Sequence, residues 1–375
     1  MQSVQIGKNQ AGQRLDKFLH KYLPNAGKSF LYKMLRKKNI TLNGKKAEGS
    51  EILMVGDEVR VFFSEETFAK FSGGSFAGAC LDAAAMEDGR LKGGERTGKG
   101  AETADLAEEC LTAYERLRGI SVVYEDADCL ILDKPAGILT QKAEKADLSL
   151  NEWMIGYLLV RNPAFRKELS TFHPSVCNRL DRNTSGIVLC GKSLAGSQYL
   201  SQCIRERKVH KFYMAICAGE FLKEQRVDGY LVKDLVNNVV KVTKIPSGGE
   251  SEEKSLRIST VYRPVEAVAG YTLLEVELIT GKTHQIRGQL ASMGFPLVGD
   301  RKYGSASENS KLRRKYGLEY HLLHAGRVVF ETDAYGIPGQ TLPGKRFCAP
   351  CPETFIRIGR ELGFEKLWNN QNTDM

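Results

Sequence analysis

Residues 178–190, NRLDRNTSGIVLC, place a polar turn directly before a run of apolar residues. In this turn Asp181 stands between Arg179 and Arg182. A carboxylate among cations stays ionised, so Asp181 could act as a nucleophile, a base or a metal ligand. The same side chain could instead cap the turn by accepting hydrogen bonds from the backbone. The turn by itself leaves these alternatives open.

The region around this turn, from residue 119 onward, alternates short apolar strands with a few helices. Many of the strands follow one another without an intervening helix, which favours a mixed, mostly antiparallel sheet with flanking helices, an α+β fold. The helices are expected at 148–160 and 194–206. The strands are expected at 122–124, 129–133, 186–190, 211–217, 256–262, 271–278 and 327–330.

The first 63 residues predict a small basic α+β module. Apolar residues spaced three and four apart indicate amphipathic helices at 13–22 and 28–38, and Asn43-Gly44 is a strong tight-turn signal before the alternating strand 55–63. The module holds 12 Lys and Arg against five Asp and Glu. Such an excess could attract a polyanion, or it could be an ordinary solvated surface.

Residues 64–118 are rich in Gly, Ala and Glu and poor in large apolar residues. Such a composition buries too little surface to offset its ordering entropy, so we expect a flexible linker with a short helix near 104–118. The chain therefore divides into a basic module at 1–63, a linker at 64–118 and a catalytic domain at 119–375.

The composition of the 375-residue chain, with 42% hydrophobic and 26% charged residues, is typical of a globular protein. It has neither an apolar run of membrane-spanning length nor a leader-like N-terminus, so a cytoplasmic location is expected and no membrane partner. Nine scattered cysteines fit reduced thiols. Cys348 and Cys351 lack the second pair that a zinc site needs, and His321 and His324 lack a third ligand. No metal is expected.

Five further strings surround the Asp181 turn in a fixed order. Together the six strings resemble the RluA-type family of RNA pseudouridine synthases, and the resemblance covers residues 119 to about 360. It departs from the family pattern where Asn178 replaces a histidine, Asp133 an asparagine and Lys282 an arginine; of these, Asn178 is expected to alter the position of Arg179. The five strings are DKPAGILT (133–140), VHKFYMAICAG (209–219), GKTHQIR (281–287), GFPLVGDRKYG (294–304) and LHA (323–325).

The resemblance implies a set of catalytic and substrate-binding residues. Asp181 would be the nucleophile, and Arg287 would pair with it and hold it ionised. Tyr213 would pack on the uracil face opposite Ile286, and Arg179 would help to displace the target nucleotide from its stack. Each of these residues also has a structural alternative. Arg287 could form an ordinary ion pair at the end of a strand, and Tyr213 could be a core tyrosine. Arg179 could simply neutralise Asp181. His284 is expected to be a structural hydrogen-bonder.

The implied reaction detaches uracil from C1′ of ribose, turns the base and rejoins it through C5. Asp181 would attack C1′ or deprotonate C2′, and the sequence does not decide between these routes. Since the reaction involves no redox change and no activated donor, no cofactor is expected.

The basic module resembles the small RNA-binding domain named after ribosomal protein S four, through residues 14–19, 28–38, 40–44 and 56–59. This resemblance implies binding to structured RNA, with ribosomal RNA the expected partner and no obligate protein partner. The residues expected to contact phosphates are Lys28, Arg36, Lys37, Lys38, Lys45 and Lys46.

Two other classes of protein compete with this interpretation. A non-catalytic RNA-binding or assembly factor would be expected to lose Asp181, Tyr213 or Arg287, and all three are present. A nucleoside hydrolase or glycosidase would normally need a second carboxylate or a metal to activate water. No such partner is evident near the Asp181 turn, and release of free uracil would identify that class.

Overall fold

The computed structural model describes residues 2–7, 9–72, 99–169, 172–234, 239–243, 255–334 and 341–366. Its contacts group the chain into two compact units. The first unit comprises Met1–Arg118, Asn151–Ser175 and Gly191–Gln198, and the second comprises Gly119–Leu150, Val176–Cys190 and Tyr199–Met375. The predicted division at residues 63/64 and 118/119 stays a prediction.

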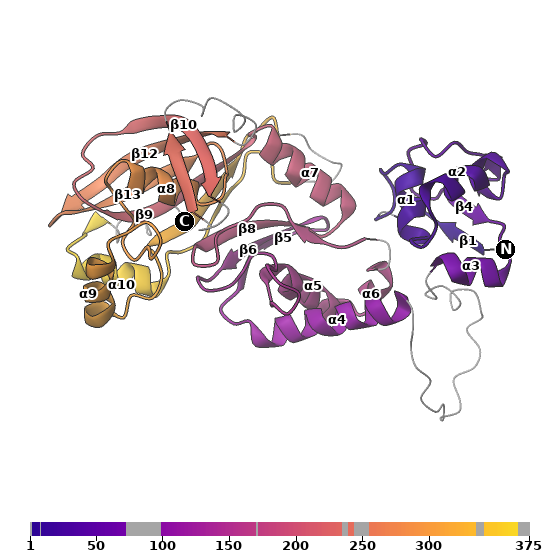
Figure 1. Cartoon of the computed structure of the whole chain (residues 1–375), viewed down its shortest axis with the longest axis horizontal. Helices are drawn as coiled ribbons and strands as arrows, with labels where there is room; N and C mark the ends of the chain where they lie inside the picture. The colour runs from indigo at the N-terminus through magenta and orange to yellow at the C-terminus, as the bar shows by residue number, and fades with distance from the viewer. Residues whose placement is uncertain are drawn as a thin grey trace, which may run out of the picture. The chain divides into compact units, whose positions relative to one another are not determined.

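The N-terminal module of the first unit is a four-stranded antiparallel sheet with two helices (Figure 1). Both predicted helices are present, because Leu15, Phe18 and Leu19 form one buried stripe and Leu31 and Leu35 another. Strand β1 was not expected. The elements are β1 Gln2–Gln5, α1 Leu15–Tyr22, α2 Lys28–Arg36, β2 Ile40–Leu42, β3 Lys45–Lys46 and β4 Glu58–Val61, with strand order β1-β4-β2-β3.

Two helices lie within the segment that the sequence predicts to be a flexible linker. They are α3 (Glu65–Ser72) and α4 (Lys99–Arg116), so the short helix expected near 104–118 is present and longer. Helix α4 buries Ala107, Cys110 and Ala113, one small residue per turn. Small residues allow close helix packing. In α3 the buried Phe68 belongs to the core of the N-terminal module, so residues 65–72 form a helix where the sequence predicts a flexible linker. Residues 73–98 lie outside the described part of the chain.

Helix α4 packs on α5 (Leu150–Arg161), as Figure 1 shows. A Cβ at Gly156 would clash with the carbonyl oxygen of Cys110, so the two backbones approach as closely as only glycine allows. Tyr114 lies against Trp153, with 5.4 Å between ring centroids. A one-turn helix, α6 (Phe165–Glu168), follows α5.

The second unit contains an 11-stranded sheet in the order β11-β10-β12-β13-β9-β14-β8-β6-β5, with β15 paired to β14 and β7 to β8. The β8–β14 pair is parallel, whereas β5–β6 and the pairs from β11 to β14 are antiparallel. The strands are β5 Ser121–Glu125, β6 Cys129–Lys134, β7 Ser175–Val176, β8 Ser185–Gly191, β9 Val209–Ala218, β10 Gln225–Asp234, β11 Val239–Thr243, β12 Leu256–Val268, β13 Tyr271–Leu278, β14 Leu323–Phe330 and β15 Arg346–Cys348.

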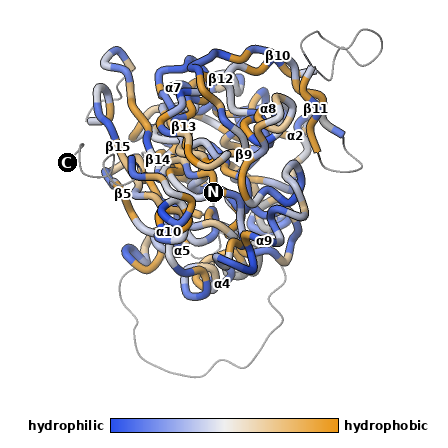
Figure 2. The backbone as a smooth tube through the Cα atoms, turned by 90° about the vertical axis from the view of Figure 1, so that its left-hand side faces the viewer, coloured by the Kyte–Doolittle hydropathy of each residue, from blue (hydrophilic) through white to orange (hydrophobic). Residues whose placement is uncertain are grey.

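Helices α8 (Gln285–Ser292), α9 (Ala306–Tyr316) and α10 (Glu353–Glu361) cover parts of this sheet (Figure 1). Gln289 of α8 accepts a hydrogen bond from Tyr262 of β12 and donates one to the carbonyl of Val227 in β10. Helices α9 and α10 share a core that contains Tyr316 and Ile358. Figure 2 colours stretches of β9, β13 and β14 as hydrophobic, in line with a core on the sheet.

The predicted α+β class and the mostly antiparallel sheet are confirmed. All seven predicted strands are present, and the two predicted helices are α5 and α7 (Leu194–Arg205). Strands β7, β10, β11 and β15 and helices α6, α8, α9 and α10 were not predicted. Within the described residues, no helix combines the length and the apolarity needed to cross a bilayer.

Candidate active site

The turn that carries Asp181 lies between β7 and β8 and is held on both sides by residues of the 133–140 string. Thr140 Oγ1 donates to the carbonyl of Leu180 at 2.7 Å and accepts from its N–H at 3.1 Å. On the other side, Gly137 N–H donates to the carbonyl of Arg182 at 2.8 Å. The backbone is therefore fixed at the residues immediately before and after Asp181.

Lys134 adds further hydrogen bonds between the 133–140 string and the turn that carries Asp181. Its side chain is fully buried, and its ammonium donates to the carbonyls of Pro135 and Ile138 at 2.9 Å and of Arg182 at 3.2 Å. Burial lowers the pKa of Lys134 to about 7, against the opposing charges of Asp181 and Asp133. Lys134 thus ties the two strings together through carbonyl oxygens.

Arg287 lies between two carboxylates. Its NH1 donates to Oδ2 of Asp181 at 2.7 Å, while its Nε and NH2 bind the two oxygens of Asp300 at 2.7 and 3.0 Å. The side chain of Asp300 is 0% exposed and that of Arg287 is 8% exposed, but Asp181 keeps 23% of its surface open. One carboxylate therefore anchors the arginine and the other remains accessible to a substrate.

The electrostatics of this cluster keep Arg287 and Asp300 charged. Burial opposes the charge on Arg287, but its hydrogen bonds and its attraction to Asp300 and Asp181 outweigh burial and raise its pKa above the usual value. Burial likewise disfavours the Asp300 anion, and Arg287 reverses that effect and lowers the pKa of Asp300. An ionised pair with full hydrogen bonding is the arrangement in which buried charges are tolerated.

His284 precedes α8 in a left-handed conformation, with φ 53°. Its Nδ1 forms a hydrogen bond with the Tyr303 hydroxyl at 2.9 Å, and its Nε2 lies 3.8 Å from Oδ2 of Asp181. Tyr303 also accepts from the N–H of Val240 in β11 and lies under Arg287, 5.2 Å from the guanidinium carbon to the ring centroid. Burial lowers the pKa of His284. The expected structural role of His284 agrees with these contacts.

Tyr213 and Ile286 are both buried, at 6% and 4% exposure. Tyr213 stands on β9, and burial together with the charge of Asp181 raises the pKa of its hydroxyl. That hydroxyl has no hydrogen-bond partner among the described residues. Ile286 directly precedes Arg287 on α8. The structure thus pairs Arg287 with Asp181, and it places Tyr213 where the charge of Asp181 acts on its hydroxyl.

Arg179 is exposed and has no ion-pair partner among the described residues. Its position disfavours the alternative in which it neutralises Asp181 through a direct ion pair. The neighbouring Asn178 accepts from the N–H of Leu189 at 2.7 Å and so fixes the β7–β8 hairpin. That contact gives Asn178 a structural role in the backbone.

Two buried histidines hold the strand that follows the catalytic turn. His321 forms a hydrogen bond with Thr184 at 2.8 Å, and His324 forms one with Ser185 at 2.9 Å and a second with the carbonyl of Ala349. Because the carbonyl only accepts, Nε2 of His324 carries its proton, and Nδ1 of the neutral ring accepts from Ser185. Burial lowers the pKa of both histidines to about 4.

The basic residues expected to contact RNA lie on α2, directly after its end, and on β3. All of them are exposed, and none has an ion-pair partner within the described part of the chain. Lys38 adopts a left-handed conformation at the end of α2, with φ 58°. They are Lys28, Arg36, Lys37, Lys38, Lys45 and Lys46.

Lys134, Asp300 and Tyr303 lie in strings that carry the family resemblance, but the sequence predicts no role for these three residues. Asp300 stands in GDRKYG, 13 residues beyond Arg287, and nothing in the spacing shows that the two side chains pair. A signal was available in the charges themselves, because an arginine that is expected to be buried needs more than one acceptor.

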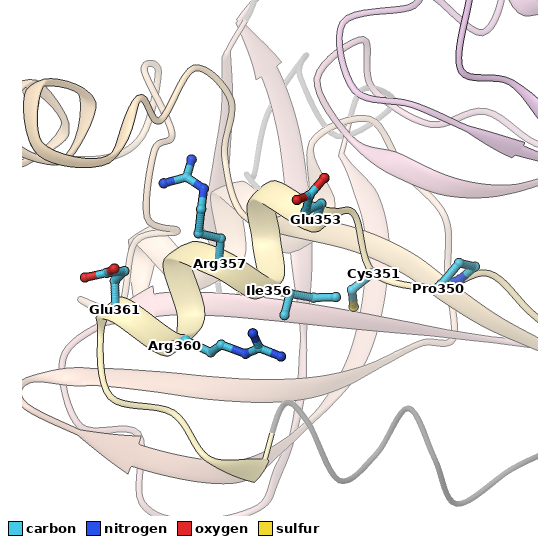
Figure 3. Close-up of a pocket in the computed structure, with 7 residues that line it drawn as sticks. All are labelled: Pro350, Cys351, Glu353, Ile356, Arg357, Arg360 and Glu361. Atoms are coloured by element: carbon cyan, nitrogen blue, oxygen red, sulfur yellow. The ribbon is translucent and has the colours of Figure 1, made fainter.

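A hollow along α10 contains none of these residues (Figure 3). Figure 3 shows Arg357 and Arg360 pointing to different sides of the helix, and Arg357 donates to the carbonyl of Tyr316. The charges of the hollow are mixed, with two arginines against Glu353 and Glu361. In the described residues, no group of three or more His, Cys, Asp or Glu side chains is placed to hold a metal.

Comparisons with known proteins agree on one family. The family model described as RNA pseudouridylate synthase matches residues 128–292. The ribosomal large subunit pseudouridine synthase C of Vibrio cholerae is 30% identical over 331 residues, which cover 88% of this chain and 89% of that protein. Its namesake from Escherichia coli is 26% identical, over 87% and 88% of the two chains. The solved structure of human RNA pseudouridylate synthase domain containing 4 shares the fold, with a TM-score of 0.51 and 20% identity over 69% of this chain and 98% of that one.

Proposed function

Since the chain belongs to the RNA pseudouridine synthase family, and is thus an isomerase acting on RNA, we propose that Asp181 is its nucleophile and that its substrate is large-subunit ribosomal RNA. The observation that carries the first part is the Asp181–Arg287 ion pair of 2.7 Å beside a buried tyrosine. The relatives from Vibrio cholerae and Escherichia coli are named for the large ribosomal subunit, which supports the second part.

The isomerisation breaks the C1′–N1 bond of uridine and forms a C1′–C5 bond; C5 gives up its proton and N1 takes up a proton, so the composition of the nucleotide is unchanged. Asp181 is the group that reacts with the ribose, either at C1′ or by removing the C2′ proton, because its carboxylate is open on the side not bound by Arg287. The uracil stacks on Tyr213 with Ile286 as the opposite wall. Both walls are buried, which excludes water from the detached base and favours rejoining over hydrolysis.

The target nucleotide must leave its stack to reach Asp181, since only 23% of that side chain is exposed and it is bound to the buried Arg287. Arg179 is exposed beside the catalytic turn and unpaired among the described residues, so it is free to take the place of the extruded base. The module at 1–63 grips structured RNA through the basic side chains of α2 and its following turns. A second attachment raises the effective concentration of the target uridine at the catalytic unit. The enzyme works in the cytoplasm and needs no obligate protein partner.

The test uses large-subunit ribosomal RNA transcribed in vitro with tritium at uracil C5. The wild type is expected to release tritium without releasing uracil. Asp181→Ala is expected to reduce the rate by at least about 10⁴-fold, the order of loss that follows removal of a nucleophile. The matched control is Asp228→Ala, because Asp228 is an exposed carboxylate paired with Arg226 on β10 and should be silent.

Three results would overturn the proposal. Activity of Asp181→Ala near that of the wild type would remove Asp181 from the chemistry. Free uracil in place of retained base would indicate a hydrolase. An inert wild type on this RNA, with activity on labelled transfer RNA, would reject the ribosomal substrate.

A further inference from the structure

Two lysines lie near the catalytic cluster, and their ammonium groups have opposite surroundings. Lys134 is fully buried and donates to three carbonyl oxygens. Lys211 of β9 is partly buried, and among the described residues its ammonium has neither a hydrogen bond nor an ion pair. A half-buried ammonium without a partner is costly, since burial removes water that nothing replaces.

Lys211 faces the same side of the sheet as Tyr213. The two residues are separated by one position on β9, so their side chains point to one face, ~7 Å apart along the strand. On that face the cross-strand neighbour of Lys211 is Val328, which is 3% exposed and belongs to a hydrophobic core. The stem of Lys211 therefore has an apolar neighbour, while its ammonium has no counter-charge there.

The ammonium reaches the loop that leads from β13 to α8. Nζ of Lys211 lies 3.8 Å from the position that a Cβ would occupy on Gly281. Among the described residues other than Gly281 and its two chain neighbours, no further heavy atom comes within 4 Å of that position. Gly281, Lys282 and Thr283 are exposed, and the same loop continues into His284 and Arg287 of the catalytic cluster. The cation is thus presented at an open edge of the site.

We propose that Lys211 binds a phosphate of the RNA backbone next to the target uridine, with the Gly281 loop as the open side through which the phosphate enters. The proposal rests on the proposed function, since it is the RNA substrate that supplies the anion. Uracil and ribose are neutral, so phosphates are the negative charges that RNA brings into the site. The base and its phosphates are joined through one ribose, and Tyr213 and Lys211 stand two positions apart on one face of β9. Burial lowers the pKa of the Lys211 ammonium, and a bound phosphate would favour the charged form again.

The first experiment measures tritium release from the labelled ribosomal RNA at several salt concentrations. Lys211→Met keeps the stem and removes the charge. It is expected to raise KM about 10-fold, as for a lost charge-assisted contact, with kcat at saturating RNA nearly unchanged. The slope of log KM against log salt should fall in magnitude by about 0.7 to 0.9, the value for one phosphate contact. Lys211→Arg should stay close to wild type, and Lys223→Met, at an exposed lysine after β9, should change neither KM nor the slope.

A second variant tests the geometry and separates binding from folding. Gly281→Glu offers Lys211 an internal carboxylate, whereas Gly281→Ala adds only a methyl at ordinary contact distance. If the introduced carboxylate acts through Lys211, the effects of Gly281→Glu and Lys211→Met on KM will be non-additive in the double variant. The Tm of Lys211→Met is expected to equal or exceed that of the wild type, because an unpaired buried charge is removed.

The same comparison in an Asp181→Ala background, by direct binding of the RNA, does not depend on turnover. An inert wild type would reject the proposed activity, while this binding measurement still decides the role of Lys211. Unchanged affinity and an unchanged salt slope in Lys211→Met would overturn the inference. So would a loss of kcat at constant KM, which would place Lys211 in the chemical step.

Discussion

Two arginines of the second unit each bind two or more carboxylates, on opposite faces of the same sheet. Arg287 joins Asp181 and Asp300 at a side-chain exposure of 8%. Arg263 of β12 joins Glu224, Glu275 and Glu277 at an exposure of 34%. On β13, Glu275 and Glu277 alternate with Val276, whose partner on β9 is Tyr213, so the Arg263 network lies on the face away from the catalytic tyrosine.

Burial, and not the number of ion pairs, decides what each of these arginines does. The Arg263 network continues through His210 to Glu331 and Lys208, so each member has alternatives and water nearby. Arg287 differs, because Asp300 is fully buried and depends on Arg287 to compensate its charge. Individual exposed pairs contribute little to stability, whereas one partner of a buried pair cannot be removed without leaving an uncompensated charge.

The largest effect is expected from the substitution Arg287→Met. It leaves Asp300 buried without its cation, so the free energy of unfolding is expected to fall by about 3 to 5 kcal/mol. Tritium release should be lost as well, because Asp181 loses the group that orients it. Urea unfolding followed by circular dichroism, together with the tritium assay, measures both effects.

A double-variant cycle separates the buried charge from general damage. Adding Asp300→Asn to Arg287→Met removes the stranded anion, so the double variant should be more stable than the sum of the two single losses predicts. Additive losses would show that the Arg287–Asp300 pair is not a coupled unit. Activity should stay low in the double variant, since Asp181 still lacks its partner.

The sequence predicts features that depend on local patterns and does not predict those that depend on long-range contacts. Alternating apolar residues on β13 and the helical stripes of α1 and α2 predict those elements correctly, because their periodicity is local. The order of six strings, through the family resemblance, singles out Asp181, Arg287 and Tyr213, and the structure pairs the first two. Asp300, Lys134 and Lys211 received no role, because their importance depends on which groups the fold brings near them and on how much water it removes. The helix α4 was underestimated for a similar reason: its small residues become apolar packing only against Gly156 of α5.

A second, smaller effect is expected from pH, through the histidines that hold the strand after the catalytic turn. An unfolded histidine titrates near pH 6.5, whereas burial lowers the pKa of His321 and His324 to about 4. Their contribution to stability is therefore complete above pH 6.5 and is lost as the pH falls toward 4. At pH 5 the loss is about 2 kcal/mol for each histidine. Asp133 opposes this trend below pH 6, because burial raises its pKa to about 6 and the folded chain then binds the proton.

The variant His324→Gln isolates one of these contributions. It should lower the free energy of unfolding at pH 7 by about 1 kcal/mol, the typical value for a lost hydrogen bond. Between pH 7 and pH 5 it should then lose about 2 kcal/mol less than the wild type, since its own titration is gone. Parallel urea curves at the two pH values give the difference directly. An identical pH dependence in variant and wild type would show that the pKa of His324 does not differ between the folded and the unfolded chain.

The smallest effect is expected from Arg263→Met. This variant is the exposed counterpart of Arg287→Met and so serves as its control. The substitution breaks hydrogen bonds to two carboxylates, as Arg287→Met does, but on a face where water can replace them. The free energy of unfolding should change by less than about 1 kcal/mol, and the tritium assay should be unaffected. The change in the free energy of unfolding should be smaller still in about 0.5 M salt, because salt of that order screens exposed charges. A loss as large as that of Arg287→Met would mean that the number of ion pairs governs stability in this sheet, and burial would then no longer explain why one arginine serves the active site and the other the surface.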